Sequence, residues 1–325
     1  MKPISRFLLA AAFSLVTASA IAQPAHEPFR LKDLRKIVDI SNPAISPNGK
    51  EIAFIISRAD WEKDKRVPEI ELVDVGTGSI RSLSYRRDDI SNLRWSPDGK
   101  SLAFIAWDSR SKKAQIFVMP MDGGDPVRIT DSRTSVSEFS WNPDGHEIAF
   151  VAQDTVPNPE AISHHEDAFK VTENDYTVRA AVEPWHIWIV PAKGGTPKRL
   201  TEGAWSLNTD KGMMTPLSWT PDGRAIAFAR FPDVWYGDVW GSTIARVNTL
   251  RGKVETIVPD TASVEPVYAP SSGLLAFMRP REGDLNNGNA VYVEENGKMS
   301  SCEWYSYDYP SNKRKCAWHV TREIS

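Results

Sequence analysis

Trp95-Ser-Pro-Asp-Gly-Lys-Ser-Leu-Ala-Phe104 is the stretch that decides the fold, because the chain repeats it. Three further copies are close and a fifth is degenerate: Ile45-Ser-Pro-Asn-Gly-Lys-Glu-Ile-Ala-Phe54, Trp141-Asn-Pro-Asp-Gly-His-Glu-Ile-Ala-Phe150, Trp219-Thr-Pro-Asp-Gly-Arg-Ala-Ile-Ala-Phe228 and Ala269-Pro-Ser-Ser-Gly-Leu-Leu-Ala-Phe277. Their prolines stand at 47, 97, 143, 221 and 270, at intervals of 50, 46, 78 and 49 residues. Periods of this length indicate an architecture in which each repeat is one supersecondary unit.

Each copy has the chemistry of a tight turn between two strands. Proline sets φ at the first corner, Asp or Asn folds its side chain back onto the backbone, and glycine accepts a positive φ. The Ile-Ala-Phe run that follows is a short apolar segment, as expected for a strand covered on both faces. A second hairpin follows in each unit, most clearly at 115–130 and 186–201. Four strands in units of roughly 40–50 residues predict an all-β fold, a β-propeller of about five four-stranded blades.

The 78-residue interval marks an insertion in the third repeat. From the turn proline to the second hairpin there are 19 to 23 residues in four repeats, but 44 in the third. The extra residues therefore fall at about 153–184, between the second and third strands of blade three. Long insertions in repeat proteins map to loops on one face, which is often the binding face.

Composition and charge exclude several classes of protein. The 325 residues are 41% hydrophobic and 25% charged, which is an ordinary globular composition and excludes a disordered chain. The 39 basic and 42 acidic side chains give a net charge of −3. No basic excess is present to attract nucleic acid or anionic lipid.

Residues 1–22 have the pattern of a signal peptide. Lys2 and Arg6 accompany an apolar stretch that runs from residue 7 to 16, and Ala20-Ile21-Ala22 is a small-x-small cleavage pattern. The apolar stretch is too short to span a bilayer as a permanent helix, and an uncleaved anchor is the alternative. We expect an exported protein, periplasmic or secreted, with no membrane attachment after cleavage.

The repeated Ser-Pro-Asp-Gly-Lys-x-Leu-Ala-Phe pattern resembles two related groups of proteins. It is similar to the repeat of TolB-like (WD40-like) propellers, and to that of the N-terminal propeller of prolyl oligopeptidase-type serine peptidases, family S9. The opening segment 31–49 is similar to that of bacterial S9 peptidases, in which a short helix precedes the first blade. The segment 164–176 and the following His186-Ile-Trp-Ile-Val-Pro191 resemble that subfamily rather than TolB. The resemblance covers residues 28–298.

In the S9 family the propeller is a gating and substrate-docking cap, and a following α/β-hydrolase domain carries the catalytic Ser on a Gly-x-Ser-x-Gly elbow. That motif occurs nowhere in this sequence. No triad can be transferred to this chain, so we expect no catalytic residue, no cofactor and no peptidase activity of the chain alone. The implied partner is a peptide substrate or a hydrolase domain. The alternative is a non-catalytic TolB-like scaffold that binds proteins or peptides of the cell envelope.

Residues 299–325 lack the repeat pattern, although they contain both cysteines of the chain, Cys302 and Cys316. An exported compartment would allow a disulfide between them, and an aromatic tail that covers the open edge of the propeller is another interpretation. A frameshifted gene end explains the missing blades, the missing catalytic domain and the change in composition together. It is the interpretation that the sequence favours.

Two groups of residues are candidates for substrate or domain contact. One is the acidic and histidine-containing stretch of the insertion: His164, His165, Glu166, Asp167, Glu173 and Asp175. Adjacent histidines rarely bind one ion and no His-Glu-x-x-His spacing accompanies them, so we expect no metal site. The negative charge of this stretch would attract a peptide's N-terminal amine. The second group is Trp235 and Tyr236 in blade four, which suit peptide binding if exposed; packing against the neighbouring blade is the alternative.

Overall fold

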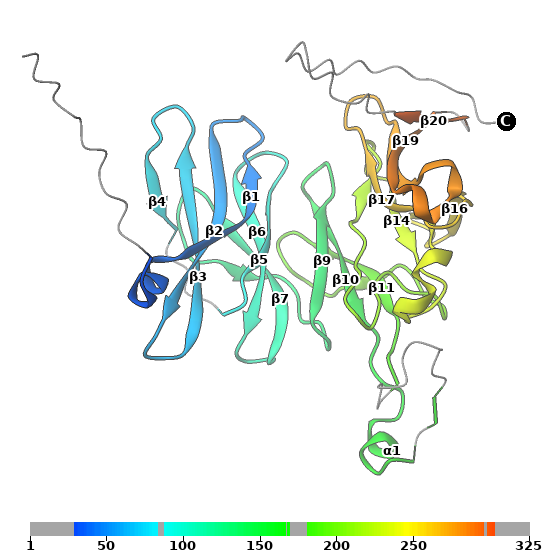
Figure 1. The fold of residues 1–325 in the computed structure, drawn as a ribbon, viewed down its shortest axis with the longest axis horizontal. Helices are drawn as coiled ribbons and strands as arrows, with labels where there is room; N and C mark the ends of the chain where they lie inside the picture. The colour runs from blue at the N-terminus through cyan, green and yellow to red at the C-terminus, as the bar shows by residue number, and fades with distance from the viewer. Residues whose placement is uncertain (1–28, 84–87, 167, 170–180, 296–297, 303–325) are drawn as a thin grey trace, which may run out of the picture. The chain divides into compact units, whose positions relative to one another are not determined.

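The computed structural model describes residues 29–302, apart from 84–87, 167, 170–180 and 296–297 (Figure 1). It divides into two units, Met1–Ile37 and Val38–Ser325. In the first unit, Leu31–Lys36 form a 3-10 helix, η1, which is the short helix that the resemblance implies. The expected signal peptide at 1–22 lies outside the described residues. No helix within the described part of the chain is long and apolar enough to cross a membrane.

The second unit contains five four-stranded antiparallel sheets, blades one to five, in which the strands pair in sequence order. The strands are β1 (Val38–Ile45), β2 (Glu51–Asp60), β3 (Lys65–Asp74) and β4 (Ile80–Ser82) in blade one; β5 (Ser91–Trp95), β6 (Ser101–Asp108), β7 (Lys113–Pro120) and β8 (Val127–Arg128) in blade two; β9 (Val136–Trp141), β10 (Glu147–Gln153), β11 (Trp185–Pro191) and β12 (Lys198–Arg199) in blade three; β13 (Ser218–Trp219), β14 (Ala225–Arg230), β15 (Thr243–Asn248) and β16 (Val254–Val258) in blade four; and β17 (Val264–Tyr268), β18 (Leu275–Pro280), β19 (Asn289–Glu295) and β20 (Lys298–Cys302) in blade five. This confirms the all-β architecture of about five blades.

Within the second unit, the short helices of the described residues lie in connections between strands: α1 (Pro159–Ser163), η2 (Tyr236–Gly241), η3 (Arg281–Gly283) and η4 (Leu285–Asn287). The last strand, β20, extends four residues past the boundary of 298 that the repeat pattern gave, so Cys302 is part of blade five. The pattern missed this strand because its residues resemble no other copy. The rest of the tail, including Cys316, lies outside the described residues, and the disulfide stays a prediction.

The Pro-Asp-Gly turns are ordered by their own side chains. In blade two, the Asp98 carboxylate accepts hydrogen bonds from Ser96 Oγ at 2.7 Å and from the backbone N–H of Lys100 at 3.0 Å. The hydrogen bond from Ser96 and that from the Lys100 N–H lower the pKa of Asp98, so the carboxylate that closes the turn stays ionised. Gly99 follows with a φ of 71°, a left-handed conformation that only glycine adopts at little cost.

The hydrophobic core lies between consecutive blades. Four clusters of buried side chains join blades one and two, two and three, three and four, and four and five. In blade two, Ala103 and Phe104 are fully buried and lie in different clusters, Ala103 facing blade three and Phe104 facing blade one. Successive side chains of a strand point to opposite faces. Because this strand is covered on both faces, the sequence repeats a continuous Ile-Ala-Phe run rather than an alternating pattern.

Three tryptophans at one position of the repeat connect each blade to the one before it. Trp95 Nε1 donates to Ala44 O at 2.9 Å, Trp141 Nε1 to Arg94 O at 3.2 Å, and Trp219 Nε1 to Ser140 O at 3.2 Å. The acceptor in every case is the residue just before the equivalent position of the preceding blade. The indoles are less than a tenth exposed, as expected for core residues. Each therefore packs as an apolar side chain while its N–H fixes the register of two sheets.

We expect Trp219→Phe to lower the free energy of unfolding by about 1–3 kcal/mol, because the carbonyl of Ser140 loses its partner and some packing is lost. Urea denaturation followed by circular dichroism measures this change. The matched control is Trp240→Phe, whose indole is 57% exposed and which should leave stability within about 0.5 kcal/mol. Equal effects of the two substitutions would contradict a structural role for the indole N–H.

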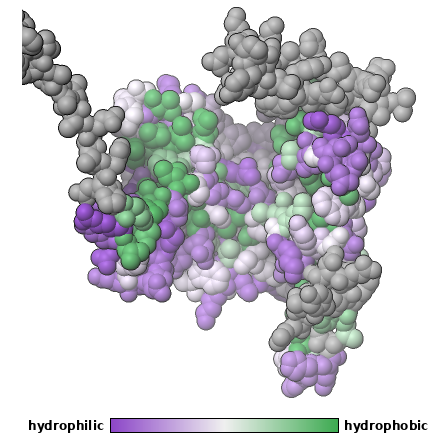
Figure 2. Space-filling view, in the orientation of Figure 1, coloured by the Kyte–Doolittle hydropathy of each residue, from purple (hydrophilic) through white to green (hydrophobic). Residues whose placement is uncertain are grey.

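Blade one has no tryptophan at this position. Ile45 stands there and is 66% exposed, and Ile40 on the same strand is 65% exposed. Figure 2 shows apolar surface gathered over β1 and β2. Blade one therefore exposes apolar side chains of β1 on this face, although Phe54 and Ile56 of β2 on the same face are buried. The corresponding faces of blades two, three and four are covered by the blade before them.

Candidate binding surface at the second connection of each blade

In each blade, the connection between the second and third strands lies at the opposite end of the sheet from the Pro-Asp-Gly turn, because antiparallel strands reverse direction. These connections are residues 61–64, 109–112, 154–184, 231–242 and 281–288, and together we call them the insertion rim. The longest is in blade three, where α1 lies (Figure 1). Loops held on a rigid scaffold are where binding residues concentrate.

A pocket of about 560 Å³ opens at the insertion rim of blade one, with Trp61 in its wall. The Trp61 side chain is 54% exposed. Several charged groups around it are paired: Lys63 Nζ lies 3.2 Å from Asp60 Oδ2, and Arg58 Nη2 lies 3.0 Å from Glu71 Oε1. The pocket therefore offers an aromatic face among charges of both signs, with carboxylates in slight excess, and its volume suits a small ligand or a few side chains of a peptide.

A second pocket of about 490 Å³ adjoins the first and reaches blade two. It shares Lys65 and Asp88 with the first pocket and has Trp107, which is 38% exposed, in its wall. Lys65 Nζ donates to Asp88 Oδ1 at 2.9 Å, and this hydrogen bond raises the pKa of Lys65. The backbone N–H of Trp107 donates to the backbone carbonyl of Asp88 at 3.0 Å. Two partly exposed tryptophans from neighbouring blades therefore flank one ion pair.

The blade-three insertion is pinned at both ends. The Asp154 N–H donates to Pro184 O at 2.8 Å, and Gln153 Nε2 donates to Glu183 O at 3.0 Å. Arg199 Nη2 holds the Asp154 carboxylate at 2.7 Å. Burial raises the pKa of Glu183, and the neighbouring carboxylate of Asp154 adds to this. The two ends of the insertion are therefore hydrogen-bonded to each other where the loop leaves and re-enters the blade, next to the Asp154–Arg199 ion pair.

His186 lies directly beneath this clamp and is fully buried. Its ring nitrogens lie 3.2 Å from Thr201 Oγ1 and 3.1 Å from Gly203 O. Burial lowers the pKa of His186, although Asp154 Oδ2, 3.8 Å from Nε2, acts in the opposite direction. In blade two, Gln115 has the same place, accepting from Thr130 Oγ1 at 2.7 Å and donating to Ser132 O at 2.9 Å. The imidazole is therefore a neutral structural link in blade three.

The structure places the predicted histidine stretch at the end of α1. His164, His165 and Glu166 are all exposed, and the Glu166 N–H caps the helix by donating to Ala161 O at 2.9 Å. Asp167, Glu173 and Asp175 lie outside the described residues, so the full acidic cluster stays a prediction. Among the residues that the structure describes, no group of three His, Cys, Asp or Glu side chains is placed to hold a metal ion.

The aromatic pair of blade four is divided by the structure. Trp235 is 7% exposed, so its side chain is buried and not presented to a peptide. Tyr236 is 48% exposed at the start of η2, and Trp240 is 57% exposed near its end. Val239, between them in η2, is buried and anchors the short helix to the blade.

Trp61 and Trp107 were not among the predicted contact residues. Their signal in the sequence is position: Trp107 follows Phe104-Ile-Ala directly, and Trp61 follows the corresponding strand of blade one, so both stand where the second strand reaches the rim. From the sequence, a tryptophan at the end of a buried strand is predicted to be a core residue. Only the structure shows that these two side chains lie at the end of the sheet, where the neighbouring blade no longer covers them.

Comparison with known proteins agrees with this architecture. Residues 28–159 match the model of the TolB beta propeller domain. The chain is 32% identical over 99 residues to the uncharacterized peptidase YuxL of Bacillus subtilis (strain 168), a match that covers 30% of this chain and 15% of YuxL.

Two solved structures show the same fold. The putative TolB from Agrobacterium tumefaciens matches with a TM-score of 0.52 and 18% identity, over 81% of this chain and 80% of that chain. A puromycin-hydrolyzing peptidase from Mycobacterium tuberculosis matches with a TM-score of 0.55 and 12% identity, over 82% of this chain and 37% of that chain. This chain thus spans a minor part of the length of both peptidases, and its residues 28–159 are similar to the TolB beta propeller domain.

Proposed function

We propose that this chain is the substrate-docking propeller of an exported S9-type serine peptidase, and that it has no peptidase activity without an α/β-hydrolase domain. The observation that carries the proposal is the 32% identity over 99 residues to a peptidase. The absence of a Gly-x-Ser-x-Gly elbow from the sequence supports the inactivity of the chain by itself.

The insertion rim supports a docking role on physical grounds. Trp61, Trp107, Tyr236 and Trp240 are all between about one third and three fifths exposed, although aromatic side chains of this size are usually buried. Aromatic rings bury a large apolar area at small cost in conformational entropy, which is why they dominate contacts with peptides. The Lys65–Asp88 pair between Trp61 and Trp107 adds one donor and one acceptor for peptide groups.

We expect the double variant Trp61→Ala/Trp107→Ala to weaken peptide binding by about tenfold or more, since truncation of an aromatic contact costs about 1–2 kcal/mol. Fluorescence anisotropy of a fluorescein-labelled octapeptide with a central Phe measures the affinity. The matched control is Leu250→Ala, which is 79% exposed at the opposite end of blade four and should bind the peptide unchanged. Undiminished binding by the double variant would exclude these pockets as the docking site.

Two further measurements test the rest of the proposal. Hydrolysis of dipeptidyl and N-acylated aminoacyl p-nitroanilides by the purified chain should be zero. Sequencing the gene through codon 299 and reading all three frames downstream should reveal more Pro-Asp-Gly repeats and a Gly-x-Ser-x-Gly elbow. If nothing related follows, the peptidase proposal fails.

The second candidate is a TolB-like scaffold of the cell envelope that binds proteins without catalysis. One observation favours it: the match to the putative TolB covers 80% of that chain, against 37% of the peptidase. A scaffold of this kind should bind a folded envelope protein and show no affinity for the labelled octapeptide, whereas the docking propeller should bind the octapeptide.

A further inference from the structure

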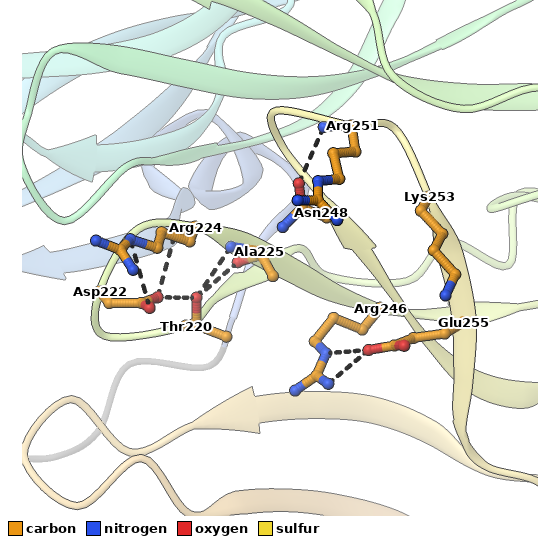
Figure 3. Close-up of a pocket in the computed structure, with 9 residues that line it drawn as sticks. All are labelled: Thr220, Asp222, Arg224, Ala225, Arg246, Asn248, Arg251, Lys253 and Glu255. Atoms are coloured by element: carbon orange, nitrogen blue, oxygen red, sulfur yellow. Dashed lines mark hydrogen bonds and ion pairs between the residues drawn. The ribbon is translucent and has the colours of Figure 1, made fainter.

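A pocket of about 350 Å³ lies at the other end of blade four, away from the insertion rim (Figure 3). It is formed by the Pro-Asp-Gly turn, by the turn that joins β15 to β16, and by the facing parts of these two strands. Four cationic side chains from these segments line the pocket: Arg224, Arg246, Arg251 and Lys253. The pocket thus draws its charge from three separate segments of the blade.

The two carboxylates in the pocket are each already engaged. Glu255 Oε1 accepts from Arg246 Nε at 3.0 Å and from Arg246 Nη2 at 2.5 Å. Asp222 Oδ1 accepts from Thr220 Oγ1 at 2.6 Å and from the Arg224 N–H at 3.1 Å. These hydrogen bonds lower the pKa of both carboxyls, so each stays ionised and offsets one cation. The positive charges of Arg251 and Lys253 remain without a counterpart in the pocket.

The turn that carries Arg251 and Lys253 is held in place. Asn248 Oδ1 accepts from the backbone N–H of Leu250 at 3.1 Å and of Arg251 at 2.9 Å, and the Gly252 N–H donates to Asn248 O at 2.8 Å. A cation presented by a fixed turn loses less conformational entropy when it binds a ligand than one on a mobile loop.

The corresponding turns of the other blades do not share this charge. In blade two the turn contains Asp122 and Asp125, and in blade one it contains Gly, Thr and Ser after Val75. In blade three, Lys193 lies in this turn and Lys198 begins β12, and the facing Pro-Asp-Gly turn has His146 where blade four has Arg224. The combination of Arg224, Arg251 and Lys253 is therefore found in blade four and not in blades one to three.

We propose that this pocket binds a dianionic oxyanion of the phosphate class. Arg251 and Lys253 supply the matching charge, and the Arg251 guanidinium has planar donors suited to phosphate oxygens. Arg246 is already held by Glu255 and Tyr268. A volume of about 350 Å³ holds a phosphate group with a small organic substituent. This site is separate from the insertion rim and does not depend on the proposed docking function.

The test is titration of the whole chain with inorganic phosphate at constant ionic strength, followed by isothermal calorimetry, with acetate as a singly charged comparison. We expect saturable binding of phosphate, weaker binding of acetate, and an affinity for phosphate reduced at least ~10-fold in Arg251→Ala/Lys253→Ala, since two charge-assisted contacts are lost. Both side chains are exposed, so the variant should fold, which circular dichroism verifies.

The control is Lys193→Ala/Lys198→Ala, which removes the same charge from the equivalent end of blade three, from the turn and the start of β12. It should bind phosphate as the unmodified chain does. Absence of saturable phosphate binding, or an equal loss of affinity in the control, would overturn the proposal, because the attraction would then belong to the general charge of the surface.

Discussion

Replacement of Phe228 by alanine should lower the free energy of unfolding by about 3–5 kcal/mol. Phe228 is fully buried on β14, and its ring stacks on Trp205 at 5.6 Å between centroids with an interplanar angle of 15°. It belongs to the cluster that joins blades three and four. Truncation leaves a cavity between two sheets, and because the strands are fixed by their backbone ladders, the sheets cannot close to fill it.

Thermal and urea denaturation followed by far-UV circular dichroism measure this loss. Leu250→Ala removes a comparable apolar side chain from an exposed turn and should change stability by less than about 0.5 kcal/mol. A loss below about 1 kcal/mol for Phe228→Ala would mean that blades three and four are not packed as the structure has them.

The stability of the chain should fall as the pH falls below about 6.5, and His186 should account for a distinct part of this fall. Burial holds the pKa of His186 below the ordinary value. Below about pH 6.5 the unfolded chain binds a proton at this residue that the folded chain does not bind, so acid favours unfolding. The slope from this one group approaches about 1.4 kcal/mol per pH unit and ends at the lowered pKa. Above about pH 6.5 the imidazole is neutral in both states and contributes no slope.

His186→Gln should remove that part of the slope while the blade stays intact, because Gln115 makes the equivalent hydrogen bonds in blade two. Urea midpoints at pH 5, 6, 7 and 8 measure the effect. His146→Gln, at an exposed turn position, is the matched control and should keep the slope of the unmodified chain. A slope unchanged by His186→Gln would show that the buried imidazole already takes up the proton when folded.

The candidate surfaces were much less accessible to sequence reasoning than the fold. The histidine stretch at 164–166 was found from its composition, but Trp61 and Trp107 were missed, and Trp235 was paired with Tyr236 although only Tyr236 is exposed. The basic pocket of blade four was also missed. Its cations stand 22 to 29 residues from Arg224 along the chain, and no local pattern connects them.

The blades, their turns and the position of the long connection in blade three could all be predicted from the order of residues along the chain. These features depend on contacts within ten residues: proline, aspartate and glycine close each turn, and the Ile-Ala-Phe run follows at a fixed distance. The tertiary structure alone decided which aromatic rings reach the surface, which carboxylates are engaged, and that His186 is a neutral internal link. Those properties depend on the packing of one sheet against the next and on side chains brought together from distant strands. The spacing of residues along one strand does not show which side chains of the adjacent sheet will cover it.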